Sequence, residues 1–490
     1  MRVSHYLLAI DQGTSSSRAI IFNGKAEALA QHQLPLTLQY PKDAWVEQDP
    51  RALWEATRTC CLEVMKTLKI SAKDITGIGI SNQRETTIIW DRQTGDPIYP
   101  AIVWQDRRTH NLCDAFAKES FAATITAKTG LILDPYFSAT KILWILNQIP
   151  GARAKAEKGE LAFGTVDTYL LWQLTKGNVH ATDASNAART LLFNIHTQTW
   201  DAELLKAFDI PASLLPEVRN SADDFGVTHA FGGAIPIAAV LGDQQAALVG
   251  QACFEPGMMK VTYGTGGFVV LNTGTTVVHS QNRLLSTVAY RLNGLTHYAL
   301  EGSFFAAGTT IKWLRDSLKI IHSADESESL AAGLTDNGGV YLVPAFSGLG
   351  APYWDPLARA AILGLTGSSQ PAHIVRAALE AVCYQTKDLW DCITKDATLG
   401  TTLKVDGGMS ANLWMLQFLA DTLNVNVQRP QCIETSALGA AFFAGLQTGV
   451  YTSLQEIAAL WSAKVNLQPR APNTNAYQAW LTAVNRVLAS

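Results

Sequence analysis

LLAIDQGTSSSRAIIF at residues 7–22 has a counterpart in KVTYGTGGFVVL at residues 260–271. In each stretch, a glycine-rich turn with hydroxyl side chains lies between two short apolar runs, which predicts two strands joined by a tight turn. Turns of this kind can direct backbone N–H groups and hydroxyls at anionic oxygens. Because the two stretches lie in opposite halves of the chain, we predict two lobes that close on a nucleotide.

The size and charge of the chain limit the kind of protein it can be. Its 490 residues favour two or three compact units, and 48% hydrophobic with 16% charged residues is typical of globular proteins. The formal net charge is -4, and the sequence has no run of five or more Lys or Arg. The composition therefore argues against nucleic acid as a partner.

The cysteines and the N-terminal segment bear on the compartment. The seven cysteines form no CxxC pair and no metal-ligand spacing, which predicts reduced, buried thiols. The apolar stretch before Asp11 is too short for a signal-peptide core, and no later segment approaches the length of a membrane span. We expect a soluble, cytoplasmic protein without membrane insertion.

Strands and helices alternate in the first half of the chain, as in an α/β fold. Residues 51–69 have apolar side chains at helical spacing, and a strand at 75–80 runs into the polar loop SNQRE before a second strand at 86–90. A buried strand near 235 ends in Gly-Asp and a small-residue helix. The pattern then restarts, so we divide the chain near 245 to 255 into a first lobe, residues 1–249, and a second lobe, residues 250–490.

The second half repeats a strand, a glycine-rich turn and a helix at 295–316 and again at 402–423. Near its end, ETSALGAAFFAGLQTGV (434–450) predicts a helix dense in Ala and Gly. Small side chains would let this helix lie close to a neighbouring backbone.

The first glycine-rich turn places one carboxylate beside several donors. Asp11 ends an apolar strand and precedes the hydroxyls of Thr14, Ser15 and Ser16 and the cation Arg18. Mg²⁺ near phosphate needs only one or two carboxylates, so we assign Asp11 to the metal and the other four residues to phosphate oxygens. The alternative is an ordinary surface hairpin. The chain has neither GxxxxGK[ST] nor a GxGxxG that opens a helix, which disfavours P-loop and dinucleotide-binding folds.

Asp243 is the candidate general base. It follows a buried strand and precedes Gln244 and a helix, a place where catalytic carboxylates of open α/β sheets often lie. In phosphoryl transfer to an alcohol, such a carboxylate accepts the hydroxyl proton. The alternative is an Asp that only caps the following helix.

Several other residues are ambiguous when they are taken singly. Arg84 and Glu85 pair a donor with an acceptor on the SNQRE loop, which would suit a grip on vicinal hydroxyl groups, but such a dipeptide is usually a surface ion pair. Trp104, Tyr136 and Phe268 would most often be core aromatics.

Read together, these pieces resemble the FGGY family of carbohydrate kinases, and within it the members that phosphorylate glycerol. YFSATKILWILNQ (136–148) is similar to the first family signature, and AAILGLTGSSQPAHIVRAALE (360–380) is similar to the second. Other similar blocks, in the family's usual order, are DQGTSSSRAI (11–20), SNQRETTIIWD (81–91), AIVWQDRRT (101–109), GDQQAALVGQ (242–251), YGTGGF (263–268) and KVDGG (404–408). The resemblance covers nearly the whole chain.

The resemblance implies an actin-like fold of two ribonuclease H-like lobes with the active site in the cleft between them. It also implies roles for residues of the matching motifs. The residues implied to form hydrogen bonds with the glycerol hydroxyls are Arg84, Glu85, Tyr136, Asp243 and Gln244. Those implied to surround its carbon skeleton are Trp104 and Phe268. Nucleotide contacts fall to Thr14, Ser15, Ser16, Arg18, Thr265, Gly308, Gly407 and Asn412, with Asp11 near the metal and Asp243 as the base.

The function that the resemblance implies is ATP- and Mg²⁺-dependent phosphorylation of glycerol to sn-glycerol 3-phosphate, by direct in-line transfer without a phosphoenzyme. A homodimer or homotetramer is expected from the family. Two other hypotheses remain open: an FGGY kinase for a pentulose or another small sugar, and an actin- or chaperone-like ATPase that uses the same cleft for conformational switching.

A few positions depart from the family pattern. Lys312 stands where a Gln near the nucleotide is usual, which bears on nucleotide affinity. Ala234 replaces an Arg that some members use for inhibition by fructose 1,6-bisphosphate, which argues against that inhibition. His229 precedes the same loop at a spacing similar to that of a phosphorylated His in other members, although an exposed loop His is the ordinary interpretation.

Overall fold

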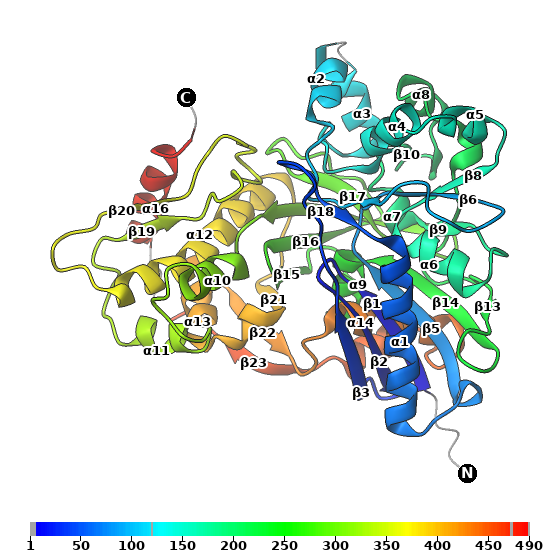
Figure 1. Ribbon diagram of the computed structural model, residues 1–490. Helices are drawn as coiled ribbons and strands as arrows, with labels where there is room; N and C mark the ends of the chain where they lie inside the picture. Colours follow the sequence, from blue (N-terminus) through cyan, green and yellow to red (C-terminus); the bar gives the residue numbers. More distant parts are fainter. Residues whose placement is uncertain (1–5, 119–120, 471–473, 489–490) are drawn as a thin grey trace.

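The computed structural model describes residues 6–118, 121–470 and 474–488, and it contains two lobes, each built on a mixed sheet (Figure 1). The six strands of the first sheet, in spatial order, are β13 (Val227–Thr228), β14 (Ile235–Gly242), β5 (Ile75–Asn82), β1 (Tyr6–Gln12), β2 (Ser16–Asn23) and β3 (Ala28–Pro35). The seven strands of the second sheet are β17 (Leu285–Leu292), β18 (Leu295–Phe304), β16 (Gly267–Gly274), β15 (Met259–Tyr263), β21 (Thr402–Asp406), β22 (Asn426–Pro430) and β23 (Ala463–Leu467).

The two sheets share one core topology. In each, an antiparallel hairpin extends on one side to a third antiparallel strand and on the other side to two parallel strands, in the orders β3-β2-β1-β5-β14 and β18-β16-β15-β21-β22. The hairpins are β1-β2 and β15-β16, the two glycine-rich stretches at residues 7–22 and 260–271. The predicted α/β fold with two ribonuclease H-like lobes is confirmed.

Helices cover the first sheet and extend above it. The predicted helix at 51–69 is α1 (Pro50–Leu68), which begins at an Asp49 cap with Pro at its first position and buries Leu53, Cys61 and Val64. Between β5 and β14 the chain builds a helical region, drawn at the upper right of Figure 1, from α2 (His110–Lys118), α3 (Ala122–Thr129), α4 (Ser138–Gln148), α5 (Ala152–Glu157), α6 (Val166–Leu174), α7 (Ala184–Ala187) and α8 (Ala202–Ala207).

Short strands accompany this helical region. Their bounds are β4 (Glu47–Gln48), β6 (Ile88–Asp91), β7 (Ala101–Ile102), β8 (Leu161–Gly164), β9 (Ala181–Asp183), β10 (Phe193–Asn194), β11 (Thr199–Trp200) and β12 (Glu217–Arg219). They form the two-stranded pairs β4-β7, β6-β8, β9-β12 and β10-β11. His229 is exposed on the loop that follows β13, as its ordinary interpretation expects.

The second lobe carries its own helices around the second sheet, at the left of Figure 1. They are α10 (Gly308–Asp316), α11 (Glu326–Ala332), α12 (Pro371–Asp396), α13 (Leu413–Leu423) and α16 (Thr474–Asn485), with the strand pair β19 (Tyr341–Val343) and β20 (Ala361–Leu363). The short helix α15 (Leu454–Leu460) packs at the lobe junction instead, where its Ile457 belongs to a hydrophobic cluster that includes Leu7 of β1 and Val270 of β16. The two predicted strand, turn and helix units are β18 with α10 and β21 with α13.

Two helices approach each other closely enough for their backbones to touch. They are α9 (Asp243–Gly250) and α14 (Thr435–Gln447), the predicted Ala- and Gly-rich helix. A Cβ atom at Gly439 would lie 1.9 Å from the carbonyl oxygen of Ala246, and one at Gly79 on β5 would lie 2.0 Å from that of Ala440. The predicted close approach is confirmed. The helix α14 belongs to the second half of the chain, yet it packs on the first sheet. A boundary near residue 250 therefore separates the two halves of the sequence, but contacts between residues of the two halves cross it.

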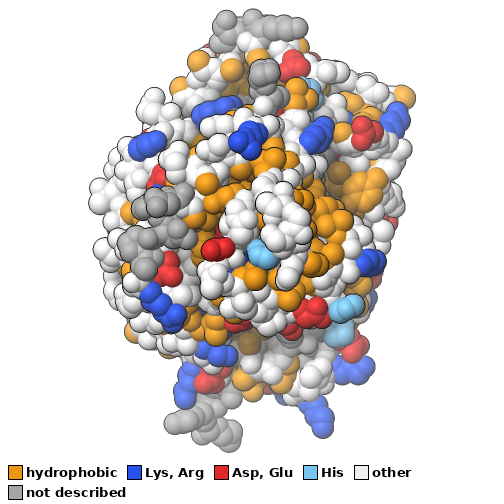
Figure 2. All heavy atoms as spheres, turned by 90° about the vertical axis from the view of Figure 1, so that its left-hand side faces the viewer, with side chains coloured by type: hydrophobic (Ala, Val, Ile, Leu, Met, Phe, Trp, Pro, Cys, Tyr) orange, Lys and Arg blue, Asp and Glu red, His pale blue; other side chains and the backbone are white. Residues whose placement is uncertain are grey.

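The surface shows where apolar side chains remain exposed. Figure 2 shows the face that the second lobe presents, with hydrophobic side chains gathered near its centre and charged ones around them. Leu357 and Leu365 of this lobe are 69% and 53% exposed. The seven cysteines are free thiols, and Cys432 is the one that is not fully buried. Within the described ranges, no helix combines the length and the apolar character that crossing a bilayer requires.

One buried carboxyl group docks the C-terminal helix α16. Asp388 on α12 accepts hydrogen bonds from the Tyr477 hydroxyl at 2.7 Å and from the Trp480 indole N–H at 3.2 Å. Burial raises the pKa of Asp388 to about 7, although its hydrogen bonds oppose that rise. The group is therefore protonated over part of the neutral range.

Asp388→Asn should flatten the pH dependence of stability. The pKa of Asp388 is about 7 in the folded chain and 3.8 ordinarily, so between these values the folded state binds more protons than the unfolded state. The contribution is present in acid and is lost as the pH rises through the folded pKa, by up to about 1.4 kcal/mol per pH unit. Urea unfolding from about pH 5 to 8 measures this slope. Equal slopes for both proteins would contradict the assignment.

Candidate active site at the junction of the two lobes

The turn of the first hairpin presents three hydroxyl side chains on a fixed backbone. The N–H of Gly13 donates to the carbonyl of Ser16 at 2.9 Å, and the N–H of Leu36 donates to the carbonyl of Ser15 at 2.8 Å. The Thr14 carbonyl accepts from the Gln48 amide at 2.6 Å. The predicted phosphate-binding residues Thr14, Ser15 and Ser16 therefore lie on one braced turn.

Charged groups flank this turn. Asp11 pairs with Arg18 in the register of β1 and β2, and Arg18 forms an ion pair with Glu434, just before α14. Burial raises the pKa of Asp11 to about 6, and the carboxylates of Glu434 and Asp243 add to the rise while Arg18 opposes it. The Ser436 hydroxyl, in the first turn of α14, donates to the Asp243 carbonyl at 3.1 Å. Asp11 thus lies among oxygen ligands and a cation, close to Asp243.

The second hairpin meets the beginning of α10. The Thr265 carbonyl accepts from the N–H groups of Ala307 and Thr309, and the Gly308 N–H donates to the Gly264 carbonyl at 3.0 Å. Beside it lies a pocket of about 370 Å³ lined by Gly308, Ile311, Lys312, Arg315, Ala324, Asp325, Ser327, Glu328, Leu379, Gly408, Met409, Ala411 and Asn412. The pocket brings together three of the predicted nucleotide-binding residues, Gly308, Lys312 and Asn412.

The loop after β21 requires its glycine. Gly407 has a φ of +82°, in the left-handed region, and a Cβ atom there would lie 2.5 Å from the Tyr263 carbonyl oxygen. Asn412 caps α13, because its side-chain oxygen accepts from the Met415 N–H at 2.8 Å. Gly407 thus adjoins the second hairpin and Asn412 the pocket, as the nucleotide assignment needs.

The predicted polyol residues converge from separate segments. Arg84, on the loop after β5, directs its Nε at an Asp243 carboxylate oxygen 3.1 Å away. The Arg84 side chain is 2% exposed, whereas that of Asp243, the first residue of α9, is 31% exposed. The Asp243 carboxylate is therefore held by Arg84 on one side and exposed on the other. Gly242 occupies the cap position of α9, and the Asp243 carboxylate also accepts from the Gln244 N–H at 2.7 Å in the first turn of that helix.

Three aromatic rings stand around these charges. The Trp104 ring lies 5.7 Å from that of Tyr136 and 6.4 Å from that of Phe268, and the Arg84 guanidinium lies 6.0 Å from the Phe268 ring. The Trp104 indole N–H donates to the Thr14 hydroxyl at 2.8 Å. This bond joins the aromatic wall directly to the phosphate hairpin.

The structure adds charged residues that the sequence argument missed. Arg189 and Glu301 are fully buried and ion-paired to Glu85 and Arg84. Lys260 on β15 is also fully buried, and its ammonium donates to the Gln244 side-chain oxygen at 2.5 Å and to the Thr262 hydroxyl at 2.8 Å.

The environment of Lys260 weakens its hold on its proton. Burial lowers the pKa of Lys260 to about 8, although Asp406, Asp243 and Glu301 oppose that shift. A signal for this residue exists in the sequence, because Lys260 interrupts the apolar run of a strand that the hairpin pattern already identifies. The lysine fixes Gln244 beside Asp243.

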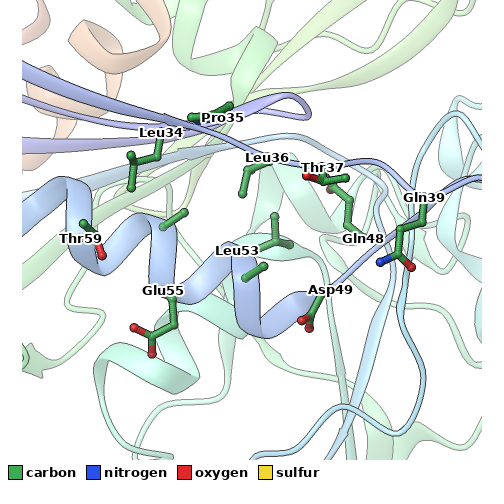
Figure 3. A pocket seen from close by; sticks show the side chains of 12 residues that line it. Leu34, Pro35, Leu36, Thr37, Gln39, Gln48, Asp49, Leu53, Glu55 and Thr59 are labelled. Atoms are coloured by element: carbon green, nitrogen blue, oxygen red, sulfur yellow. The ribbon is translucent and has the colours of Figure 1, made fainter.

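A larger hollow lies elsewhere on the first lobe. Figure 3 shows this groove, of about 640 Å³, between α1 and the chain that leaves β3, with Leu34 and Leu36 on one side and Leu53 on the other. None of the predicted site residues lines it. Gln48, at its edge, holds the Thr14 carbonyl, so the groove lies behind the phosphate hairpin.

Two duplicated lobes, two phosphate-type hairpins and a shared polar site define a kinase of the actin-like type. Residues 6–250 match the N-terminal domain, and residues 259–448 the C-terminal domain, of the FGGY family of carbohydrate kinases, and the chain belongs to this family. It is 57% identical over 99% of its length, and 98% of the relative's, to a glycerol kinase of Coxiella burnetii. It is 54% identical to glycerol kinase 1 of Pseudomonas aeruginosa, over 99% of both chains.

A solved structure agrees with these sequence relatives. The crystal structure of Plasmodium falciparum glycerol kinase with ADP superposes with a TM-score of 0.90 and 36% identity, over 99% of each chain. The predicted membership of the family is confirmed. The roles of individual site residues stay predictions.

Proposed function

We propose that this protein transfers the γ-phosphoryl group of ATP to glycerol and forms sn-glycerol 3-phosphate. The observation that carries the proposal is the Trp104–Thr14 hydrogen bond of 2.8 Å, which joins a polyol-sized set of donors, acceptors and rings to a phosphate-type hairpin. Similarity to glycerol kinases at 54–57% identity over nearly the full chain supports the choice of glycerol.

Asp243 is the proposed general base in this reaction. Its partly exposed carboxylate accepts the proton of the attacking glycerol hydroxyl, the hydroxyl oxygen forms a bond to the γ-phosphorus, and the bond between that phosphorus and the oxygen of ADP breaks. Arg84 holds the carboxylate through its Nε, 3.1 Å from the nearest oxygen. No covalent enzyme intermediate is needed.

The residues around Asp11 suit a magnesium ion. Hard oxygen ligands are what Mg²⁺ prefers, and it is bound by one or two carboxylates together with substrate phosphates and water. The pKa of Asp11 is raised by burial and by the carboxylates of Glu434 and Asp243, an excess of negative charge that a cation would offset. In the described residues no group of three or more His, Cys, Asp or Glu forms an all-protein metal cage. When bound, Mg²⁺ would neutralise charge on the phosphates.

The two lobes divide the proposed work. The first lobe, residues 1–249, would hold the polyol, the first phosphate hairpin and Asp243, and the second lobe, residues 250–490, would hold most of the nucleotide. The pocket lined by Gly308, Lys312 and Asn412 supports the second assignment. We also propose a homodimer or homotetramer, which light scattering after size-exclusion chromatography tests, and a cytoplasmic site of action, where ATP is available.

The decisive experiment measures ATP consumption in the presence of Mg²⁺ against glycerol, dihydroxyacetone, xylulose, ribulose and gluconate, with identification of the product. Preference for glycerol with formation of sn-glycerol 3-phosphate is the expected result. Preference for a sugar would keep the fold and mechanism but overturn the polyol assignment. ATP hydrolysis that no acceptor stimulates, with nucleotide-dependent polymerisation, would favour a switching ATPase.

Phe268→Ala should weaken discrimination against larger substrates. The Phe268 ring, 6.4 Å from Trp104, forms one wall of the proposed glycerol site and donates no hydrogen bond, so its loss enlarges the site without disturbing the hairpin. The ratio of kcat/KM for glycerol over that for xylulose should fall about ten-fold. The control is Tyr40→Ala, at a side chain 69% exposed. An unchanged ratio in Phe268→Ala would argue against the wall.

A further inference from the structure

Four buried charged side chains and the partly exposed Asp243 form a line of alternating sign across the lobe junction. Asp243 contacts Arg84, Arg84 contacts Glu301, Glu301 contacts Arg189, and Arg189 contacts Glu85. The nitrogen-to-oxygen distances of these four ion pairs are 3.1, 2.5, 3.0 and 2.6 Å in that order. The outer members, Asp243 and Glu85, are both proposed to touch glycerol. The middle member is the only one of the five that the second lobe supplies.

Glu301 reaches this line from β18, the strand next to the edge strand β17 of the second sheet. On β18 it lies opposite Val270 and Leu285, and the next residue, Gly302, faces Leu389 of α12. Because successive side chains of a strand point to opposite faces, Glu301 points away from α12 and toward the first lobe. A fully buried carboxylate at that position is costly unless cations surround it.

The two cations that donate hydrogen bonds to Glu301 belong to the first lobe. Arg84 donates to both carboxylate oxygens, at 2.5 and 3.1 Å, and Arg189 donates to one of them at 3.0 Å. Burial opposes the ionisation of Glu301, but Arg189 and Arg84 outweigh it and lower its pKa to about 2. The carboxylate therefore stays charged at every pH at which the protein would work.

The donors of Arg84 are almost fully committed by these contacts. Its two Nη1 hydrogens are taken by Glu301 and by the side-chain oxygen of Gln245 at 3.2 Å, and one Nη2 hydrogen goes to Glu301. A guanidinium has five N–H donors, and the Nε–H faces Asp243 at 3.1 Å, so one Nη2 hydrogen remains for a hydroxyl. Gly242 permits this pose, since a Cβ atom there would lie 2.7 Å from the Arg84 Cδ.

We propose that Glu301 is a positioning residue of the second lobe that sets the orientation of Arg84 and Arg189. Through these arginines it also orients Asp243 and Glu85. The polyol site is therefore complete only while Glu301 of the second lobe stays bound to both arginines. The inference rests on the proposed function. Without the Glu301 carboxylate, Arg84 and Arg189 would have no shared counter-ion between them. Their two positive charges would then repel each other.

Glu301→Gln tests the proposal. The amide keeps the shape but loses the charge, and it turns an N–H toward an arginine donor. The KM for glycerol should rise about ten-fold or more, while the KM for ATP stays within about two-fold, because the nucleotide pocket shares no residue with the line. Glu301→Asp keeps the negative charge on a shorter side chain. Its KM for glycerol should lie between that of the wild-type protein and that of Glu301→Gln.

The matched control is Glu380→Gln. Glu380 is also a buried second-lobe carboxylate, 2% exposed, and it pairs with Arg376 at 2.8 Å, away from the line. A merely structural role for Glu301 predicts that both glutamine variants lower the unfolding temperature and leave the KM for glycerol unchanged. That result would overturn the proposal. If Glu301→Gln does not fold, Glu301→Asp decides by the same comparison, and a wild-type KM for glycerol in it would overturn the proposal as well.

Failure of the proposal and failure of the proposed function give different results. Wild-type protein that consumes no ATP in response to glycerol contradicts the function before any variant is made. Wild-type protein that phosphorylates glycerol, together with Glu301→Gln of unchanged KM for glycerol, contradicts the role of Glu301 alone. Calorimetric titration of glycerol into both proteins gives the same ranking without turnover.

Discussion

Asp243→Asn should lower the turnover number by about 10²–10⁴-fold while glycerol still binds. The amide has the same size as the carboxylate, and its oxygen can still accept from the Arg84 Nε that lies 3.1 Å from Asp243 in the structure. It cannot take the proton of the attacking hydroxyl. The expected loss is therefore confined to the chemical step, so that the KM for glycerol changes far less than kcat.

Two measurements separate chemistry from binding in this variant. A coupled assay for ADP gives kcat, and calorimetry gives the affinities for glycerol and for a nucleotide. Asp209→Asn is the control, because Asp209 is an exposed carboxylate paired with Arg153 at 3.0 Å on the surface. Near-normal turnover of Asp243→Asn would remove Asp243 from the role of base.

Gly439→Ala should destabilise the protein more than any other single methyl addition at a glycine on α14. A Cβ atom at residue 439 would lie 1.9 Å from the Ala246 carbonyl oxygen and 2.8 Å from the Gly250 nitrogen, which are backbone atoms of α9 and cannot rotate away. The two helices would have to separate, at a cost of about 3 kcal/mol or more. The thermal midpoint should fall by about 3–6 °C.

The control for this variant is Gly367→Ala. A Cβ atom at residue 367 meets nothing within 4 Å, and its φ lies outside the left-handed region. Scanning fluorimetry of both variants, with and without nucleotide, gives the comparison. Midpoints that fall equally in the two variants would show that the contact between α9 and α14 yields to a methyl group.

Local patterns in the sequence predicted the scaffold of the site. The hairpins around Asp11 and Thr265, the helix at Pro50–Leu68 and the position of Asp243 at the end of a buried strand all depend on residues that are neighbours in the chain. Apolar alternation, turn glycines and helical spacing describe such short-range structure directly. The family signatures then placed Trp104 and Tyr136, whose rings do lie together.

Arg189, Lys260 and Glu301 could not be predicted as site residues, because their partners lie far away in the chain. Glu301 and Lys260 each interrupt an apolar strand, which indicates a buried charge that needs a counter-ion. The sequence pattern does not identify the counter-ion of Glu301. Arg84 is 217 residues away in the chain, and only the packing of one lobe against the other brings the two side chains together. The roles assigned to the other site residues also stay predictions. The structure gives the positions of their side chains, and each role is a statement about what a side chain does when substrate is bound.

The first turn of α14 makes the donor and acceptor sides of the reaction share one support. Glu434 holds Arg18 beside the phosphate hairpin, and Ser436, two residues later, holds the carbonyl of Asp243. The same helix approaches the backbone of α9 directly at Gly439, where no side chain separates the two helices. Any displacement of α14 must therefore move Arg18 and Asp243 together. The alignment of the phosphorus, the attacking hydroxyl and the base then depends on the position of this one helix and not on two lobes that move independently.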